Sequence, residues 1–231
     1  MRSRRARGTL NREQVIAAAF LVAESVGLAD LSMPGVAQHL DVGVTSLYWH
    51  VRSKDELIEA LTELATGIID ETVPLVAAPP LQPWMDHVIA QWTAYRSALR
   101  ARPILADLTI LRTGGIPSSA PAAKRRAARI DHEVAVLRGA GFSDAAARRA
   151  YAALAVFTRG SILNERLYLL AGRPSDAVVD PAEDFTLDWE AVPRLLASAP
   201  HWTHSLAGDA DFAYGLQVIV GGFAETEGVA A

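Results

Sequence analysis

Residues 40–57 read Leu40-Asp-Val-Gly-Val-Thr-Ser-Leu-Tyr-Trp-His-Val-Arg-Ser-Lys-Asp-Glu-Leu57, and the architecture of the N-terminal part follows from this segment. It opens with a turn, Asp41 to Gly43, and continues into a short helix that we expect at about residues 44–50. Another short helix, expected from about Met33 to Leu40, precedes the turn, with Ser32 as its N-cap. Two short helices joined by a three-residue turn form the helix-turn-helix arrangement.

Longer helical patterns flank this pair on both sides. The helix before it ends at Gly27, and the helix after it covers about residues 54–70. Ser53 and Glu56 have the spacing of a capping box at the start of the second of these. Apolar residues at helical spacing predict a shared core: Val15, Ala18, Ala19, Val22 and Val26, then Val36, Ala37, Leu40, Val42 and Leu47, then Leu57, Leu61, Leu64, Ala65 and Ile68.

The outward side of the second short helix carries hydroxyl groups, an imidazole and amphipathic aromatic rings. A helix face that contacts only solvent usually carries charged side chains. The groups on this face instead can form hydrogen bonds with phosphates and base edges and pack on thymine methyl groups. We therefore predict DNA contacts from Thr45, Ser46, Tyr48, Trp49 and His50. The alternative is structural: Tyr48 and Trp49 brace the first helix, and His50 is an interface histidine whose hydrogen bonds are satisfied.

Composition narrows the function classes. The 231 residues are 51% hydrophobic and 21% charged, which suits one or two globular domains and excludes a disordered chain. The absence of cysteine excludes disulfides, thiolate metal sites and a cysteine nucleophile. No apolar run approaches the ~18 residues of a membrane span, and no secretory signal is evident, so we expect a cytoplasmic protein without membrane contact.

Net charge is −4, so bulk charge favours no polyanionic partner. The first twelve residues nevertheless hold five arginines and no acidic residue. They form either a solvated tail or an arm that binds phosphates. The arginines are Arg2, Arg4, Arg5, Arg7 and Arg12.

Residues 10–65 resemble the DNA-binding domain of the tetracycline-repressor (TetR) family. The most specific part is the run Leu47-Tyr-Trp-His-Val51, followed by Lys54 and Leu57. The resemblance implies that Thr45, Ser46 and Trp49 lie near bases and that Tyr48 and His50 reach phosphates. It also implies that Lys54 meets a phosphate with help from the helix N-terminus. Ser32 completes the predicted DNA-contact set.

Two residues depart from the family pattern. Asp41 stands where the family usually has glycine, and the fold survives because aspartate tolerates a left-handed turn. Pro34 stands where several members carry a basic residue near the DNA, which leaves a contact from that helix open. Proline is tolerated there because it falls in the first helical turn.

Later segments resemble the tetracycline-repressor type of C-terminal domain: Gly141-Phe142, Phe157-Thr-Arg-Gly160 with Leu163, and Phe212 to Gly222. The resemblance implies a two-fold dimer whose interface is a four-helix bundle of helices at about 150–170 and 208–224. Gly215, Val218 and Gly222 form a stripe that suits close helix packing, because glycine within a helix costs ~1 kcal/mol relative to alanine. Packing within one chain is the alternative. The predicted interface residues are Leu154, Phe212, Gly215, Leu216, Ile219 and Gly222.

Two further stripes combine apolar and aromatic side chains with a few polar groups, as a small-molecule pocket requires. Plain core packing is the alternative for each residue. The predicted ligand-binding residues are Trp92, Tyr95, Leu99, Leu108, Thr109, Phe157, Ser161, Asn164 and Tyr168. Arg112, Glu133 and Glu165 either supply charge to a ligand or lie on the surface, and we expect the surface for each.

In drug-sensing relatives, a histidine and a glutamate help to hold a magnesium–tetracycline chelate. Those positions fall near Thr109 and Asn164 here, and neither side chain is a good replacement for a metal ligand. We therefore predict no recognition of magnesium–tetracycline, no bound metal and no cofactor. His201 and His204 have metal-ligand spacing but no carboxylate beside them.

The sequence thus predicts an all-α protein with a basic arm (1–9), a helix-turn-helix domain (10–53), a connecting helix (54–70) and a C-terminal ligand-binding and dimerisation domain (71–231). The expected function is a homodimeric transcriptional repressor, released from a palindromic DNA operator by a small-molecule effector. No nucleotide motif or catalytic triad points to an enzyme. The alternatives are a small-molecule-binding helical protein or enzyme that has lost DNA binding, and a regulator that works by dimerisation alone.

Overall fold

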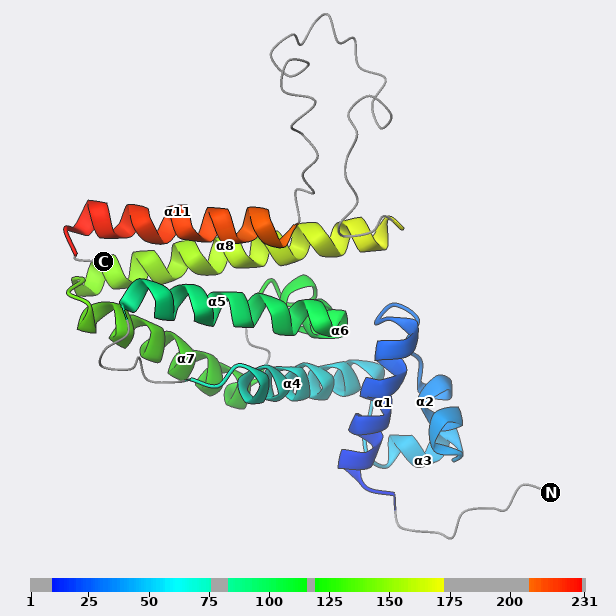
Figure 1. The fold of residues 1–231 in the computed structure, drawn as a ribbon. Helices are drawn as coiled ribbons and strands as arrows, with labels where there is room; N and C mark the ends of the chain where they lie inside the picture. The colour runs from blue at the N-terminus through cyan, green and yellow to red at the C-terminus, as the bar shows by residue number, and fades with distance from the viewer. Residues whose placement is uncertain (1–9, 76–82, 116–118, 173–207, 230–231) are drawn as a thin grey trace, which may run out of the picture. The chain divides into compact units, whose positions relative to one another are not determined.

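The computed structural model describes residues 10–75, 83–115, 119–172 and 208–229. Within these ranges all regular structure is helical, so the predicted all-α class is confirmed (Figure 1). The chain divides into two compact units, each with its own core. The first unit comprises Met1–Val76 and Ser97–His132, and the second comprises Ala77–Arg96 and Glu133–Ala231.

The first unit contains the helix-turn-helix and the segments packed on it. Its helices are α1 (Arg12–Val26), α2 (Met33–Leu40), α3 (Val44–Tyr48), α4 (Lys54–Thr72), α6 (Pro103–Ala106) and the π-helical turn η1 (Asp107–Leu111). The first part of α7 (Ala120–Gly139) also belongs to it. The sequence places a domain boundary at residue 71, whereas residues 97–132 group with the N-terminal segment because α6 and η1 pack on α1 and α4.

Side-chain caps fix where these helices begin. The Ser32 hydroxyl accepts a hydrogen bond from the Gly35 backbone N–H at 3.2 Å, so the predicted N-cap of α2 is confirmed. Asn11 caps α1 in a reciprocal arrangement with Gln14, which the sequence analysis missed. Asp41 ends α2 with φ 55°, the left-handed conformation that aspartate tolerates.

The predicted core of the first unit is largely confirmed. The buried members are Val15, Ala18, Ala19, Val22, Val36, Ala37, Leu47, Leu57, Leu61 and Ala65. The prediction that Val26 belongs to the core is wrong, because this residue lies exposed in the last turn of α1. Leu40, Val42, Leu64 and Ile68 are half-buried. Phe20 is buried outside the predicted stripe, and the Arg102 guanidinium lies 5.0 Å from its ring centre.

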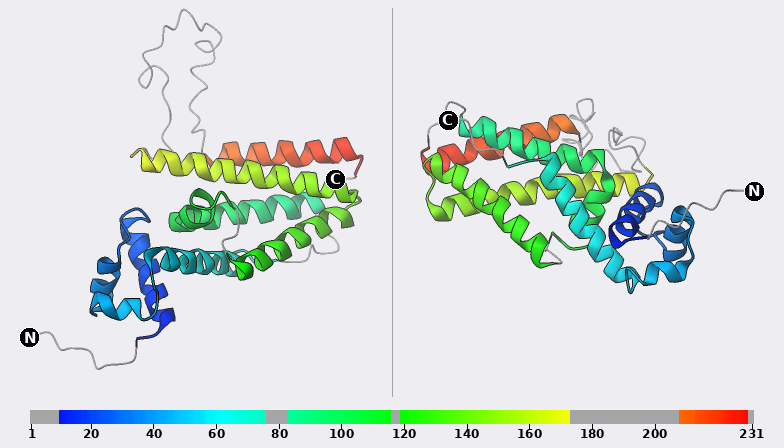
Figure 2. Two further views of the ribbon diagram at one scale, coloured as in Figure 1. Left: turned by 180° about the vertical axis from the view of Figure 1, so that it is seen from behind. Right: turned by 90° about the horizontal axis from the view of Figure 1, so that it is seen from below.

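The second unit is built on α5 (Trp84–Ala101) as far as Arg96, on α8 (Asp144–Leu170) and on α11 (Asp209–Glu227). Its core joins Trp84, Val88 and Trp92 of α5 to residues of α8 and α11. Figures 1 and 2 show α8 and α11 side by side. Three of the predicted interface residues, Leu154, Phe212 and Leu216, lie inside this core.

Each of those three residues is at most 4% exposed within the chain itself. Their place in a dimer interface stays a prediction. Phe212 and Leu216 of α11 pack with Leu154 of α8 in the same chain. Ile219 is half-buried and Gly222 is exposed.

Gly215 lets α11 approach α8. A Cβ built on Gly215 would lie 2.5 Å from Cζ of Phe157, which is too close for real atoms. The Phe157 ring stacks on Phe212 at 5.3 Å between ring centres, so it has little room to turn away. For Gly215, packing within one chain explains the missing side chain.

We expect Gly215→Ala to lower the free energy of unfolding by ~1–3 kcal/mol, because it overpacks this contact. Gly67→Ala, in open space on α4, is the matched control and is expected to be neutral or stabilising by up to ~1 kcal/mol. Denaturant unfolding of both variants checks this. A Gly215→Ala protein as stable as the parent would contradict the packing described here.

Candidate functional site

The α3 helix presents the predicted DNA-contact residues, but it is shorter than the sequence suggests. It ends at Tyr48, and Trp49 and His50 lie in the turn that follows, where the backbone N–H of His50 donates to Leu47 O at 2.8 Å. Leu47 is fully buried and anchors this segment in the core. The residues around it are therefore displayed on a fixed support.

Exposure distinguishes the members of this set. Trp49 is 85% exposed and Tyr48 is 48% exposed, which is unusual for large aromatic side chains. Thr45 is exposed, whereas Ser46 and His50 are half-buried. Because Trp49 packs so little surface within the chain, the alternative in which it braces α1 receives no support.

The start of α4 lies directly after this turn. The Ser53 hydroxyl accepts from the Glu56 backbone N–H at 3.0 Å, so the predicted cap is confirmed. The Glu56 carboxylate does not complete the predicted box. It accepts from the backbone N–H of Arg52 at 2.8 Å and lies 3.5 Å from an Nη atom of Arg12. Lys54, the first residue of α4, is exposed.

These contacts change the titration of Glu56. The hydrogen bond from the Arg52 backbone lowers the pKa of the Glu56 carboxyl group; desolvation opposes it, and Arg12 adds to the lowering. The carboxylate therefore keeps its contacts at neutral pH and loses them only as the pH falls through that lowered pKa. The contact between Arg12 and Glu56 was missed in the sequence, because the two residues lie 44 positions apart.

Ser32 lies at the other end of the helix-turn-helix. Its oxygen accepts the capping bond, and its hydroxyl proton remains able to donate to a phosphate. It is exposed. The basic arm at residues 1–9 lies outside the described residues.

The predicted ligand-binding residues divide between the two units. Leu99, Leu108 and Thr109 belong to the first unit. Leu99 and Leu108 are buried, and the Thr109 hydroxyl donates to Leu105 O at 2.6 Å. Trp92 is buried in the second unit, where Tyr95, Phe157, Ser161, Asn164 and Tyr168 are half-buried. Their role in binding stays a prediction.

Two acidic residues expected on the surface are buried instead. Glu133 and Glu165 are at most 5% exposed, whereas Arg112 is exposed as expected. The guanidinium of Arg96, itself buried, lies 3.4 Å from the Glu165 carboxylate. Arg96 was missed, yet its position one turn after Trp92 on an apolar stripe was a usable signal.

No group of three or more histidine, aspartate or glutamate side chains that could hold a metal occurs in the described part of the chain. His201 and His204 lie outside it. Among the described helices, none is long and apolar enough to cross a bilayer.

The prediction against magnesium–tetracycline can be tested by calorimetry. We expect no magnesium-dependent heat of binding, because the Thr109 hydroxyl and the Asn164 amide are poor ligands for the chelate. Titrations with and without Mg²⁺ provide the control. Magnesium-dependent binding in the micromolar range would contradict this prediction.

Comparison with known proteins identifies the two parts of the chain. Residues 15–61 match the bacterial regulatory proteins of the tetR family, and residues 78–226 match the tetracyclin repressor-like C-terminal domain. An HTH-type transcriptional repressor of Mycobacterium tuberculosis is 33% identical over 95% of this chain and 82% of its own length. The class C tetracycline repressor protein of Escherichia coli is 28% identical over 92% of this chain and 90% of its own.

Among solved structures, the TetR family protein ActR of Streptomyces coelicolor, in complex with actinorhodin, matches with a TM-score of 0.70. It is 26% identical over 97% of this chain and 100% of the other. The matches cover the helix-turn-helix and the helical second half in the order that the sequence resemblance implies. The chain therefore belongs to the tetR family of bacterial regulatory proteins.

Proposed function

We propose that the protein is a transcriptional repressor that binds a palindromic operator as a homodimer and is released by a small molecule. The observation that carries the DNA-binding part is the display of Tyr48 and Trp49 on a buried anchor, directly before the capped start of α4. Exposed aromatic and hydroxyl groups on a helix-turn-helix suit base edges and phosphates. Lys54 and the free N–H groups of α4 suit a phosphate.

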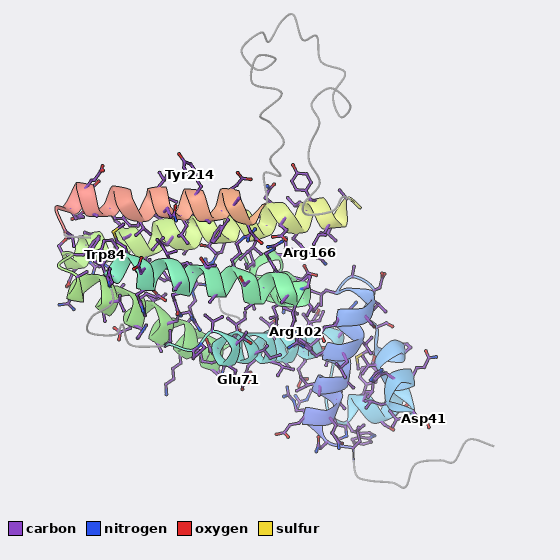
Figure 3. The ribbon with its side chains drawn as sticks, viewed as in Figure 1. Asp41, Glu71, Trp84, Arg102, Arg166 and Tyr214 are labelled. Carbon is purple, nitrogen blue, oxygen red and sulfur yellow. The ribbon has the colours of Figure 1, made fainter. Side chains whose placement is uncertain are left out.

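The dimer rests on a stripe of exposed side chains along α8. Ala153, Val156, Gly160, Leu167 and Leu170 are all exposed and follow one another at spacings of three, four, seven and three residues. On α11, Tyr214 and Val218 are exposed as well, and Tyr214 projects outward from its helix (Figure 3). A stripe with this spacing is the seam of a helical bundle, and a second copy would cover it. Two recognition helices about one DNA turn (~34–36 Å) apart would then read the two halves of a palindrome.

The effector would bind the C-terminal domain and shift α4, which carries the phosphate-binding start. A coupling free energy of ~1–3 kcal/mol changes DNA affinity ~5–150-fold, which suffices for release. The relatives supply a precedent, because the ActR structure holds actinorhodin. Localisation in the cytoplasm, where the operator would be, is part of the same proposal.

An electrophoretic mobility shift with DNA that flanks the protein's own gene tests the proposal. We expect a shifted band at low salt that weakens steeply as salt is added, because phosphate contacts release counterions. A scrambled fragment of the same length is the control. A protein that shifts both fragments equally, or neither, would overturn the proposed function and favour a helical binding protein that has lost DNA recognition.

A further inference from the structure

A buried arginine lies among α5, α8 and α11 in the second unit. Arg96 is 3% exposed, and its Nε donates to the Ser161 hydroxyl at 3.0 Å. Its two terminal nitrogens bond two carboxylates, those of Glu165 on α8 and Asp209 at the start of α11. The guanidinium also lies 4.7 Å from the centre of the Phe212 ring. A buried guanidinium requires such partners, because an unpaired charge is costly away from water.

The two carboxylates differ in their surroundings. Glu165 is buried with Arg96, whereas the Asp209 side chain is 73% exposed. Asp209 thus covers one nitrogen of Arg96 from the solvent side and gives up little hydration in doing so. A carboxylate from solution can take its place charge for charge on that nitrogen, because a charged acceptor forms a strong hydrogen bond with a guanidinium group.

Two further polar groups in the same unit have no hydrogen-bond partner in the described part of the chain. They are Nε1 of Trp92, a pure donor, and the hydroxyl of Thr158. Trp92 is 7% exposed and Thr158 is fully buried. Buried polar groups normally form hydrogen bonds, so two such groups without a partner in one region indicate a place where a ligand could supply an acceptor.

The register of the helices places these orphans near Arg96. Trp92 packs on Tyr151, and Arg96 bonds Ser161, so α5 and α8 run in the same direction and Thr158 falls between those two levels. Trp92 lies one helical turn before Arg96, about 5–6 Å between Cβ atoms. Tyr95 and Tyr151 flank the Trp92 ring, at 6.0 and 5.7 Å between ring centres.

From these contacts we propose that the effector of the proposed function is an aromatic carboxylate. Its carboxylate displaces Asp209 from Arg96, and its ring packs beside the aromatic side chains around Trp92. Trp92 Nε1 and the Thr158 hydroxyl donate to its oxygen atoms. Asp209 holds the site when it is empty, and its release frees the first turn of α11.

Calorimetry with the full chain tests this inference, with 2-naphthoate as the probe and its uncharged amide, 2-naphthamide, as the matched control. We expect one naphthoate to bind per chain and the amide to bind at least about tenfold more weakly. Asp209→Asn removes the competing charge and is expected to tighten naphthoate binding about five- to tenfold. Asp211→Asn, an exposed aspartate two residues away that pairs with no arginine in the described residues, is expected to match the parent.

Trp92→Phe removes the orphan donor and keeps an aromatic ring, and we expect it to weaken naphthoate binding about tenfold. Circular dichroism of each variant checks that the helices persist. Three results would each overturn the inference. The parent protein binds no naphthoate at about 10 mM, or it binds the amide as tightly as naphthoate. The third is an Asp209→Asn protein that binds naphthoate no tighter than Asp211→Asn does. A mobility shift on the same preparations separates the ligand class from the proposed DNA-binding function. If the protein binds DNA but not naphthoate, only the proposed ligand class is wrong.

Discussion

Lys54→Ala is expected to weaken operator binding about 10- to 100-fold. Lys54 is exposed at the first residue of α4, where its ammonium group and the free helix N–H groups suit the same phosphate. Each dimer would lose two such contacts, so the slope of log affinity against log salt should fall by about two. Mobility shifts or fluorescence anisotropy over a series of salt concentrations measure both quantities.

The chain offers a matched control for this experiment, because its only other lysine is Lys124. Lys124 is exposed on α7, away from the helix-turn-helix sequence. Lys124→Ala should leave both the affinity and the salt slope at the parent values. If the two variants lose affinity equally, the contribution is one of overall charge, and the placement of a phosphate at the start of α4 is wrong.

Val156→Arg is expected to convert the protein from a dimer to a monomer. Val156 is 72% exposed in the middle of the apolar stripe on α8. In a two-fold interface each substitution occurs twice, so two guanidinium groups would be buried without partners, which costs at least ~3 kcal/mol or about 100-fold in the dimer dissociation constant. Operator affinity should fall with the loss of the second half-site.

Sedimentation or light scattering gives the mass, which for the parent should be twice the 24.8 kDa of one chain. Val26→Arg is the matched control, because Val26 is an exposed valine on α1 outside the stripe. It should remain dimeric. A parent protein that is monomeric at micromolar concentration, or a Val156→Arg protein that remains dimeric, would contradict the interface proposed here.

Much of the first unit was predictable because its signals are local. Ser32, Asp41 and Ser53 each act on neighbouring backbone groups, so their effect is visible within a few residues of sequence. The end of α3 was less predictable, since Trp49 and His50 leave the helix to let Leu47 and Val51 pack in the core.

The two apolar faces of α8 and α11 were harder to assign. Both sides of each helix carry apolar residues, and periodicity alone does not show which side packs inside the chain. The structure shows that the Gly215 side of α11 packs inside the chain, because the Phe157 ring occupies the space that a side chain at Gly215 would take. The burial of Glu165 was likewise hard to predict, because its charge is tolerated there only in the presence of Arg96 on another helix.

Hydroxyl-radical footprinting of the parent protein on its operator fragment tests whether two helix-turn-helix units bind DNA as a two-fold pair. Two copies of α3 in adjacent major grooves would protect two blocks of backbone with like sequence, centred about one helical turn (~10 base pairs) apart. Protection of two such blocks, lost together when Lys54 is replaced, is the predicted result. A single protected block, or uniform protection along the fragment, would contradict recognition by a two-fold pair of helix-turn-helix units.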